Sequence, residues 1–296
     1  MNTVISLLAA TVSCVAIFLA SGGRNFERVD AGGHRVRVLK AGSGGPTVVF
    51  EAGAGSSLEN WVRVQHCVAE FASTIAYDRA GNGTSPRGPT PRDGRQIATE
   101  LQTILRNANA APPYVLVGHS LGGPYIRVFA GMYPDEVAGM VLVDPTQEDL
   151  VAWAKERQPK YETRESRPWD EVDCAPLTFK QAKESQTPPG VPVVLISGIG
   201  PREVPGFAPA DMKKEVLKDQ LELYPVKLKF HREWVERIPG GRVIATEKSG
   251  HGIPLEEPEL IVAAIRQIME RTRESAAGTG SAETRTPKPQ MRSKSE

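Results

Sequence analysis

The sequence predicts an α/β protein in which helices flank a mostly parallel central sheet. Three observations lead to this fold class. The chain has 296 residues, and its 40% hydrophobic and 24% charged residues are typical of a soluble globular protein. Short apolar runs alternate with segments of helical periodicity, which is the pattern of parallel strands joined by crossover helices. Residues 24–273 are sufficient for one domain with a well-buried core.

The expected strands are seven short, mainly apolar runs. They lie at 34–39, 47–50, 73–77, 114–117, 138–143, 191–196 and 242–246. Helical patterns fall between most of them, at about 58–70, 94–109, 121–133, 211–236 and 256–273. The helix at 121–133 has clear limits, because Pro124 is tolerated in a first turn and Pro134 follows its last residue.

The stretch 147–190 interrupts this alternation. It carries five prolines, mixed charges and the aromatic residues Trp153, Tyr161, Trp169 and Phe179. We expect an insertion that lies above the sheet as a short lid.

The two ends of the chain differ from the middle. Residues 4–20 are 17 apolar or small residues inside an uncharged stretch, 1–23, and at about 1.5 Å per residue a helix of this length just reaches hydrocarbon thickness. No basic residue precedes the run and four arginines follow it before residue 38, so a cleaved signal and an uncleaved membrane anchor both stay open. We expect export or membrane anchoring through this segment. Residues 274–296 are rich in Ser, Thr, Gly and Pro, which predicts a disordered tail.

Charge and cysteine usage exclude several kinds of partner. Thirty-six basic residues against 35 acidic ones leave a net charge of +1, so no global field would hold the chain on nucleic acid. The three cysteines form no CxxC pair and no HExxH segment occurs, so no metal is expected.

If the chain is exported, Cys67 and Cys174 could form a disulfide between the insertion and the core; two unbridged thiols are the alternative.

Gly118-His119-Ser120-Leu121-Gly122 is a GxSxG pentapeptide in an informative context. It directly follows the strand at 114–117 and opens the helix at 121–133. A serine between strand and helix is forced into a sharp turn that presents its Oγ at the carboxyl edge of the sheet. The flanking glycines are needed because neighbouring backbone approaches too closely for a Cβ. Ser120 is therefore the candidate nucleophile.

From about Asn25 to Arg273 the chain resembles the α/β-hydrolase superfamily. Four segments match that family in the right order, and together they are far more specific than any one alone. They are the GAGSS loop after the strand TVVF, the segment 77–85 (YDRAGNGTS), the Ser120 elbow and Gly250-His251-Gly252. The resemblance implies a serine hydrolase fold with an inserted lid, and it does not fix the substrate.

The resemblance also implies roles for individual residues. His251 lies in a loop between the strand 242–246 and the last helix, where this fold places its general base. The amides of Leu121 and Ala54 would form the oxyanion hole, although Ala52 stands where a histidine is frequent in relatives. The segment 78–85 is expected to be structural, since it lacks the lysine of a phosphate loop.

Two carboxylates are candidates for the acid that orients His251. Most relatives carry an Asp just after the strand that here is 191–196, yet the first acid after this strand is Glu203. Asp144 ends the preceding strand, and some hydrolases of this fold take their acid from that position. We prefer Asp144 because a strand and Pro145 hold its backbone, and Glu203 stays the alternative.

These residues favour a serine hydrolase that cleaves a small ester or related acyl substrate without metal or cofactor. Gly53-Ala54-Gly55 lacks the third glycine of a dinucleotide fingerprint, which makes a nicotinamide cofactor improbable. An aminopeptidase or a cofactor-free haloperoxidase on the same fold, or a non-catalytic binding protein that retains the pocket, are the alternatives. The sequence does not give the natural substrate, its chain length or the oligomeric state.

Overall fold

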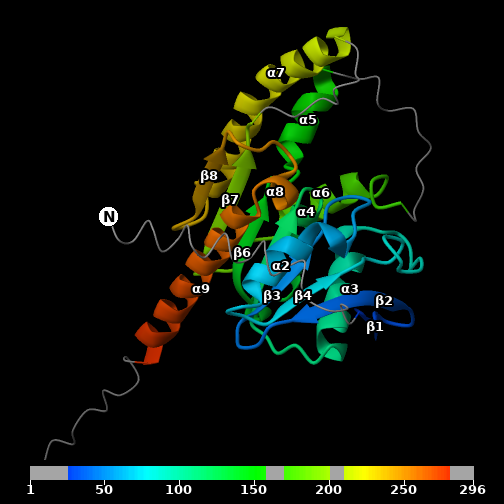
Figure 1. Ribbon diagram of the computed structural model, residues 1–296, viewed down its shortest axis with the longest axis vertical. Helices are drawn as coiled ribbons and strands as arrows, with labels where there is room; N and C mark the ends of the chain where they lie inside the picture. Colours follow the sequence, from blue (N-terminus) through cyan, green and yellow to red (C-terminus); the bar gives the residue numbers. More distant parts are fainter. Residues whose placement is uncertain (1–25, 158–169, 201–209, 281–296) are drawn as a thin grey trace, which may run out of the picture.

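An eight-stranded sheet forms the centre of the molecule (Figure 1). The structure, a computed structural model, describes residues 26–157, 170–200 and 210–280. The strand order is β1-β2-β4-β3-β5-β6-β7-β8. β1 and β2 are antiparallel at one edge, and the strands from β4 to β8 run parallel. This is the predicted fold class.

The elements fall close to their predicted positions. The strands are β1 (Phe26–Asp30), β2 (Arg35–Ala41), β3 (Thr47–Glu51), β4 (Thr74–Tyr77), β5 (Tyr114–His119), β6 (Val137–Val143), β7 (Val193–Gly198) and β8 (Arg242–Thr246). The helices are η1 (Leu58–Trp61), α2 (Val62–Val68), α3 (Gly94–Asn107), α4 (Gly122–Met132), η2 (Pro134–Glu136), α5 (Glu148–Arg157), α6 (Ala175–Glu184), α7 (Ala210–Val235), α8 (Ile253–Glu256) and α9 (Pro258–Gly280).

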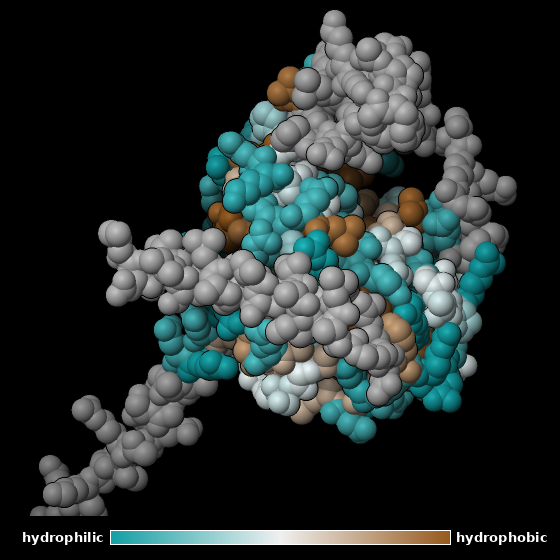
Figure 2. All heavy atoms as spheres, in the orientation of Figure 1, coloured by the Kyte–Doolittle hydropathy of each residue, from teal (hydrophilic) through white to brown (hydrophobic). Residues whose placement is uncertain are grey.

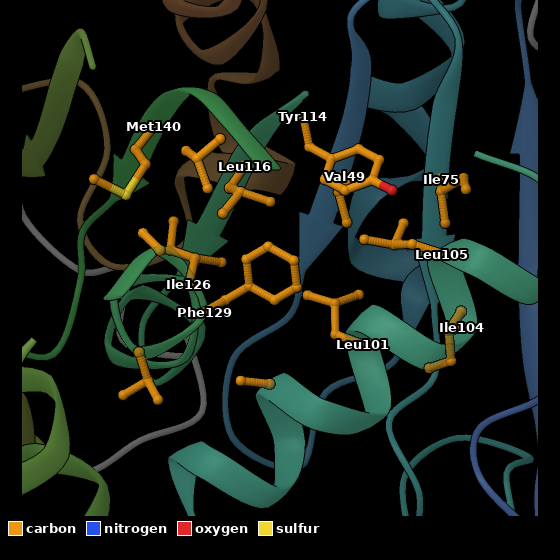
Figure 3. Close-up of a cluster of buried hydrophobic side chains, with 14 of the residues drawn as sticks. Val49, Ile75, Leu101, Ile104, Leu105, Tyr114, Leu116, Ile126, Phe129 and Met140 are labelled. Carbon is orange, nitrogen blue, oxygen red and sulfur yellow. The ribbon is translucent and has the colours of Figure 1, made fainter. Parts of the chain in front are cut away.

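Apolar side chains cover both faces of the sheet. Alternate strand residues point to opposite sides, so Val49 and Leu116 pack under α3 and α4 on one face (Figure 3). Val48 and Val115 pack against α2 and α9 on the other. All residues of β3, β4, β5, β6 and β7 are buried. This double burial explains why these strands occur as continuous apolar runs.

The insertion at 147–190 contributes two helices, α5 and α6. α6 packs against α3 and α4, and α5 lies beside α7 at the top of Figure 1. Residues 158–169 of the predicted lid lie outside the described residues. Cys174, at the start of α6, and Cys67 on α2 are not joined by a disulfide.

Several elements differ from the sequence prediction, among them α5 and α6 in the insertion and the first and last elements of the described chain. β1 was not predicted, because its sequence FERVD has one buried residue and three charged ones, as an exposed edge strand permits. α9 continues to Gly280, past the predicted boundary at 273, since Ala276 and Ala277 favour the helix. The rest of the predicted tail and the apolar segment 1–23 lie outside the described residues.

The described surface is mainly polar. The face in Figure 2 carries isolated hydrophobic residues among hydrophilic ones. In the part of the chain that the structure describes, no helix is both long and apolar enough to span a bilayer.

Candidate active site

Ser120 occupies a sharp turn between β5 and α4. Its φ of 54° lies in the left-handed region, which a non-glycine residue seldom adopts. A Cβ on Gly118 would lie 2.6 Å from the carbonyl oxygen of Gly122, and a Cβ on Gly122 would lie 2.4 Å from that of Glu51. Both flanking glycines are therefore required, as the sequence predicts. The Ser120 amide donates to the carbonyl of Val143 at 3.1 Å, which ties the turn to β6.

Ser120, His251 and Asp144 form a continuous hydrogen-bonded line. The Nε2 atom of His251 lies 3.0 Å from Ser120 Oγ, and its Nδ1 atom lies 2.7 Å from Asp144 Oδ2. His251 comes from the loop between β8 and α8, and Asp144 directly follows β6. The fold thus brings together three residues that are 24 and 107 positions apart in the chain. Glu203, the alternative acid, lies outside the described residues.

The Asp144 carboxylate is buried and ionised. Burial opposes its charge, but the hydrogen bond from His251 and the positive charge of Lys227 outweigh this and lower the pKa of Asp144 to about 2. The amide of Gly198, at the end of β7, donates to Asp144 Oδ1 at 3.0 Å. Asp144 is thus oriented by partners from two neighbouring strand ends and from α7. An ionised carboxylate on Nδ1 leaves Nε2 of neutral His251 free to accept a proton from Ser120.

The loop after β3 passes directly over the elbow. A Cβ on Gly53 would lie 3.2 Å from both the Cβ of Ser120 and the Nδ1 atom of His119, a tighter contact than most Cβ atoms make. Ala54 follows at once, and Leu121 follows Ser120. Neither the Ala54 nor the Leu121 amide donates to an acceptor within the described residues. Both amides are consequently free to donate to another acceptor.

Buried charged side chains hold the loop after β3 in place. Arg79 donates to the carbonyl oxygens of Ala52 and Gly53, each at 2.6 Å, and it pairs with Glu51. The guanidinium is almost completely buried. Glu51, whose role the sequence leaves open, is thus a strand-end carboxylate paired to an arginine.

Glu171, from the insertion, completes the cluster. Its carboxylate accepts two hydrogen bonds from Arg79 at 2.8 Å and one from the Gly55 amide at 2.6 Å. Asn82 donates to both of its oxygens at 3.1 Å. Burial opposes ionisation, but the charge of Arg79 lowers the pKa of Glu171 below its ordinary value. Neither Arg79 nor Glu171 was predicted as a site residue from the sequence, although Arg79 falls within the family-like segment 77–85.

His119 connects the elbow to the loop of His251. Its Nε2 lies 2.8 Å from the carbonyl oxygen of His251, and the two rings lie against each other at an interplanar angle of 38° with their centroids 4.7 Å apart. Burial lowers the pKa of His119 to about 4, so it is neutral at physiological pH and its Nε2–H donates to that carbonyl. His119 therefore supports the site rather than titrating in it.

The segment 78–85 folds around its own carboxylate. Asp78 accepts hydrogen bonds from the amides of Leu58 at 2.8 Å and Thr84 at 3.1 Å. A Cβ on Gly83 would lie 2.3 Å from Asp78 Oδ2, so the loop needs a glycine at this position.

Comparisons with known proteins agree with this architecture. A sequence profile of the family described as "alpha/beta hydrolase fold" matches residues 46–170. The uncharacterized protein YqjL of Bacillus subtilis is 28% identical over 231 residues, which are 77% of this chain and 85% of that protein.

Solved structures show the same fold at low sequence identity. A putative lipase from Acinetobacter baumannii superposes with a TM-score of 0.57 at 18% identity, covering 86% of this chain and 93% of the lipase. A thermophilic esterase from Thermogutta terrifontis gives 0.54 at 17% identity, covering 85% and 99%. This chain thus has the α/β-hydrolase fold, with an eight-stranded, mostly parallel sheet and a serine at the sharp turn after β5, and its residues 46–170 match that family.

Proposed function

We propose that the protein is a serine hydrolase that cleaves a small ester or related acyl substrate through an acyl-enzyme. One observation carries the proposal: His251 bridges Ser120 Oγ and the Asp144 carboxylate at 3.0 and 2.7 Å. This is the arrangement in which a nucleophile, a general base and an orienting acid act together.

In the first half of the reaction Ser120 Oγ attacks the carbonyl carbon of the substrate, and His251 Nε2 accepts the serine proton. The negative charge that develops on the carbonyl oxygen is held by the amides of Leu121 and Ala54. The tetrahedral intermediate collapses when protonated His251 gives its proton to the leaving alcohol. The acyl group then remains on Ser120.

In the second half, water attacks the acyl-enzyme and His251 accepts its proton. Collapse of the second tetrahedral intermediate returns that proton to Ser120 Oγ and releases the carboxylic acid. Asp144 stays ionised throughout and stabilises the imidazolium that forms twice per cycle. No group outside the described site is needed to balance either step.

The alternatives differ in their support. An epoxide hydrolase of this fold would carry an aspartate in place of Ser120, which weighs against that reaction. A non-catalytic binding protein is suggested by the lack of an Asp after β7, but Asp144 at 2.7 Å from His251 supports the catalytic alternative. An aminopeptidase or a cofactor-free haloperoxidase would use the same three side chains, and only the substrate separates them from an esterase.

The test combines covalent labelling with a substrate panel. A fluorophosphonate should add one adduct to the wild type, found on Ser120 by peptide mapping, and none to Ser120→Ala. Turnover of p-nitrophenyl acetate, butyrate and octanoate should fall by roughly 10³-fold or more in Ser120→Ala. Ser43→Ala, an exposed serine at the opposite edge of the sheet, is the matched control and should behave like the wild type.

Two results would contradict the proposal. Ester turnover that persists in Ser120→Ala would exclude the mechanism. Cleavage of aminoacyl p-nitroanilides in preference to all the esters would identify the aminopeptidase instead.

A further inference from the structure

One face of α7 meets the ends of β6 and β7 through two buried polar side chains. Lys227 and His231 are four residues apart, so they project from the same side of the helix. Lys227 contacts Asp144, which follows β6. His231 Nδ1 lies 2.9 Å from Ser197 Oγ on β7, and its Nε2 lies 3.1 Å from the carbonyl oxygen of Pro145. α7 is therefore attached to both strand ends at the triad acid.

Lys227 holds the Asp144 carboxylate by both oxygens. Its Nζ lies 2.8 Å from Oδ1 and 3.0 Å from Oδ2, and it also donates to the carbonyl of Gly198. The side chain is 8% exposed. The three N–H donors of the ammonium thus have three acceptors, all within the loops that form the site. The Tyr224 ring lies 4.8 Å from Nζ.

A charged residue is a costly choice for this position. Burying an ammonium is unfavourable even beside a carboxylate, and neutral donors can satisfy a buried carboxylate. The Gly198 amide already provides one such bond to Oδ1. A full positive charge has two effects that a neutral donor lacks: it restrains the carboxylate strongly, and it opposes a second positive charge on His251.

We propose that Lys227 is a positioning residue of the reaction: it fixes the Asp144 carboxylate so that Oδ2 faces His251, and its charge sets the pH range in which His251 acts as a base. The inference rests on the proposed function. A positive charge behind Asp144 makes the imidazolium less favourable, so His251 returns its proton to the leaving group more readily. Lys227 touches neither nucleophile nor substrate and acts through Asp144.

The other titratable groups near Asp144 and His251 do not supply the positive charge that Lys227 provides. His119 on β5 contacts the backbone of His251, and His231 on α7 contacts the backbone of Pro145. Tyr224 on α7 lies against Lys227, and Glu257 after α8 accepts hydrogen bonds from Thr246 and Ser249. Burial lowers the pKa values of His119 and His231 to about 4, so both are neutral at physiological pH. Among the described residues, Lys227 is consequently the basic side chain besides His251 that contacts Asp144.

The experiment compares the pH dependence of ester turnover in three variants. Lys227→Met keeps most of the side-chain volume and removes the charge, whereas Lys227→Arg keeps the charge. Lys229→Met removes an exposed lysine from the same helix and is the matched control. In Lys227→Met the plateau kcat should fall by about tenfold with KM unchanged, because the orientation of Asp144 is lost. The acid limb of kcat/KM should move up by about one pH unit, because a nearby positive charge is removed.

A merely structural role would lower the folded fraction without moving the acid limb. Lys227→Arg should therefore restore the position of the limb, and Lys229→Met should match the wild type. If Lys227→Met does not fold, Lys227→Gln supplies a neutral donor to Asp144 and the same shift is expected. A folded Met or Gln variant whose acid limb coincides with that of the wild type would overturn the inference. Turnover in Ser120→Ala would instead contradict the proposed function, so the two failures are distinguishable.

Discussion

Replacing Asp144 with asparagine tests the acid and the electrostatics of the site together. Asparagine preserves the volume, but it removes the charge that faces His251 and Lys227. The pKa of Asp144 falls from its ordinary value of 3.8 to about 2, and at roughly 1.36 kcal/mol per pKa unit this difference is worth about 2 kcal/mol of folding free energy. Asp144→Asn should lower the free energy of unfolding by about 3–5 kcal/mol, because Lys227 becomes a buried charge without its counterion.

The pH dependence of this contribution has a defined sign. The folded-state pKa is depressed, so the stabilisation is fully present above about pH 4 and is lost as the pH falls through about 2. Guanidinium chloride unfolding at neutral pH should show the full difference between wild type and variant. The part of the difference in unfolding free energy that comes from the ionised Asp144 carboxylate should shrink as the pH approaches 2. Asp149→Asn, which breaks a surface pair with Lys183, is the control and should change stability by less than about 0.5 kcal/mol.

The catalytic consequence of Asp144→Asn is larger. In a well-studied serine hydrolase triad the same change lowers kcat by about 10⁴-fold, because the imidazole adopts the wrong tautomer. We expect a loss of that order here, measured on p-nitrophenyl butyrate with a correction for the folded fraction. A folded variant within tenfold of wild-type turnover would refute the assignment. Glu203→Gln would then be the next variant to measure.

Two further predictions follow from the insertion and from the amino terminus. Glu171→Gln should lower the free energy of unfolding by about 1–3 kcal/mol and reduce kcat with little change in KM, because the loop that bears Ala54 loses a charged hydrogen-bond partner. Denaturant unfolding measures the stability and ester kinetics measure kcat and KM. Glu184→Gln, on the exposed side of α6, is the control and should leave stability and kcat unchanged. We propose that residues 1–23 direct the chain to or across a membrane. Their removal should leave ester turnover intact and move the protein from the membrane or exported fraction to the cytosol. A full-length protein that already fractionates with the cytosol and keeps its amino terminus would contradict this.

Most of the sheet could be predicted because its strands are buried on both faces. Such strands appear as continuous apolar runs, and seven of the eight are found within a few residues of their predicted limits. β1 lacks this signal, since one face and one edge of it meet solvent. α5 and α6 were hidden by the prolines and mixed charges of the insertion, although α6 packs tightly against α3 and α4.

The candidate site was predictable where local backbone geometry restricts the residue type. Ser120 needs glycines at 118 and 122, and the collisions that a Cβ would cause at both positions explain the motif. The contact between Arg79 and Glu171 spans 92 residues, and no spacing in the sequence indicates it. Lys227 lies in the charged run KLKFHRE, where only its four-residue distance from His231 distinguishes it from Lys229.

The charges around the site balance in a way that suits the proposed reaction. On the side of the loop after β3, Arg79 lies between Glu51 and Glu171; burial raises the pKa of Glu51, and the positive charge of Arg79 opposes this shift. Glu171 thus compensates the charge of Arg79 through two hydrogen bonds at 2.8 Å. On the side of the base, Lys227 compensates Asp144. In the proposed reaction, the new charges are the oxyanion, which the Leu121 and Ala54 amides would hold, and the imidazolium of His251. Groups that are already oriented before the reaction stabilise such charges without reorganising when they form, and Asp144, held by Lys227 and the Gly198 amide, is oriented in this way toward His251.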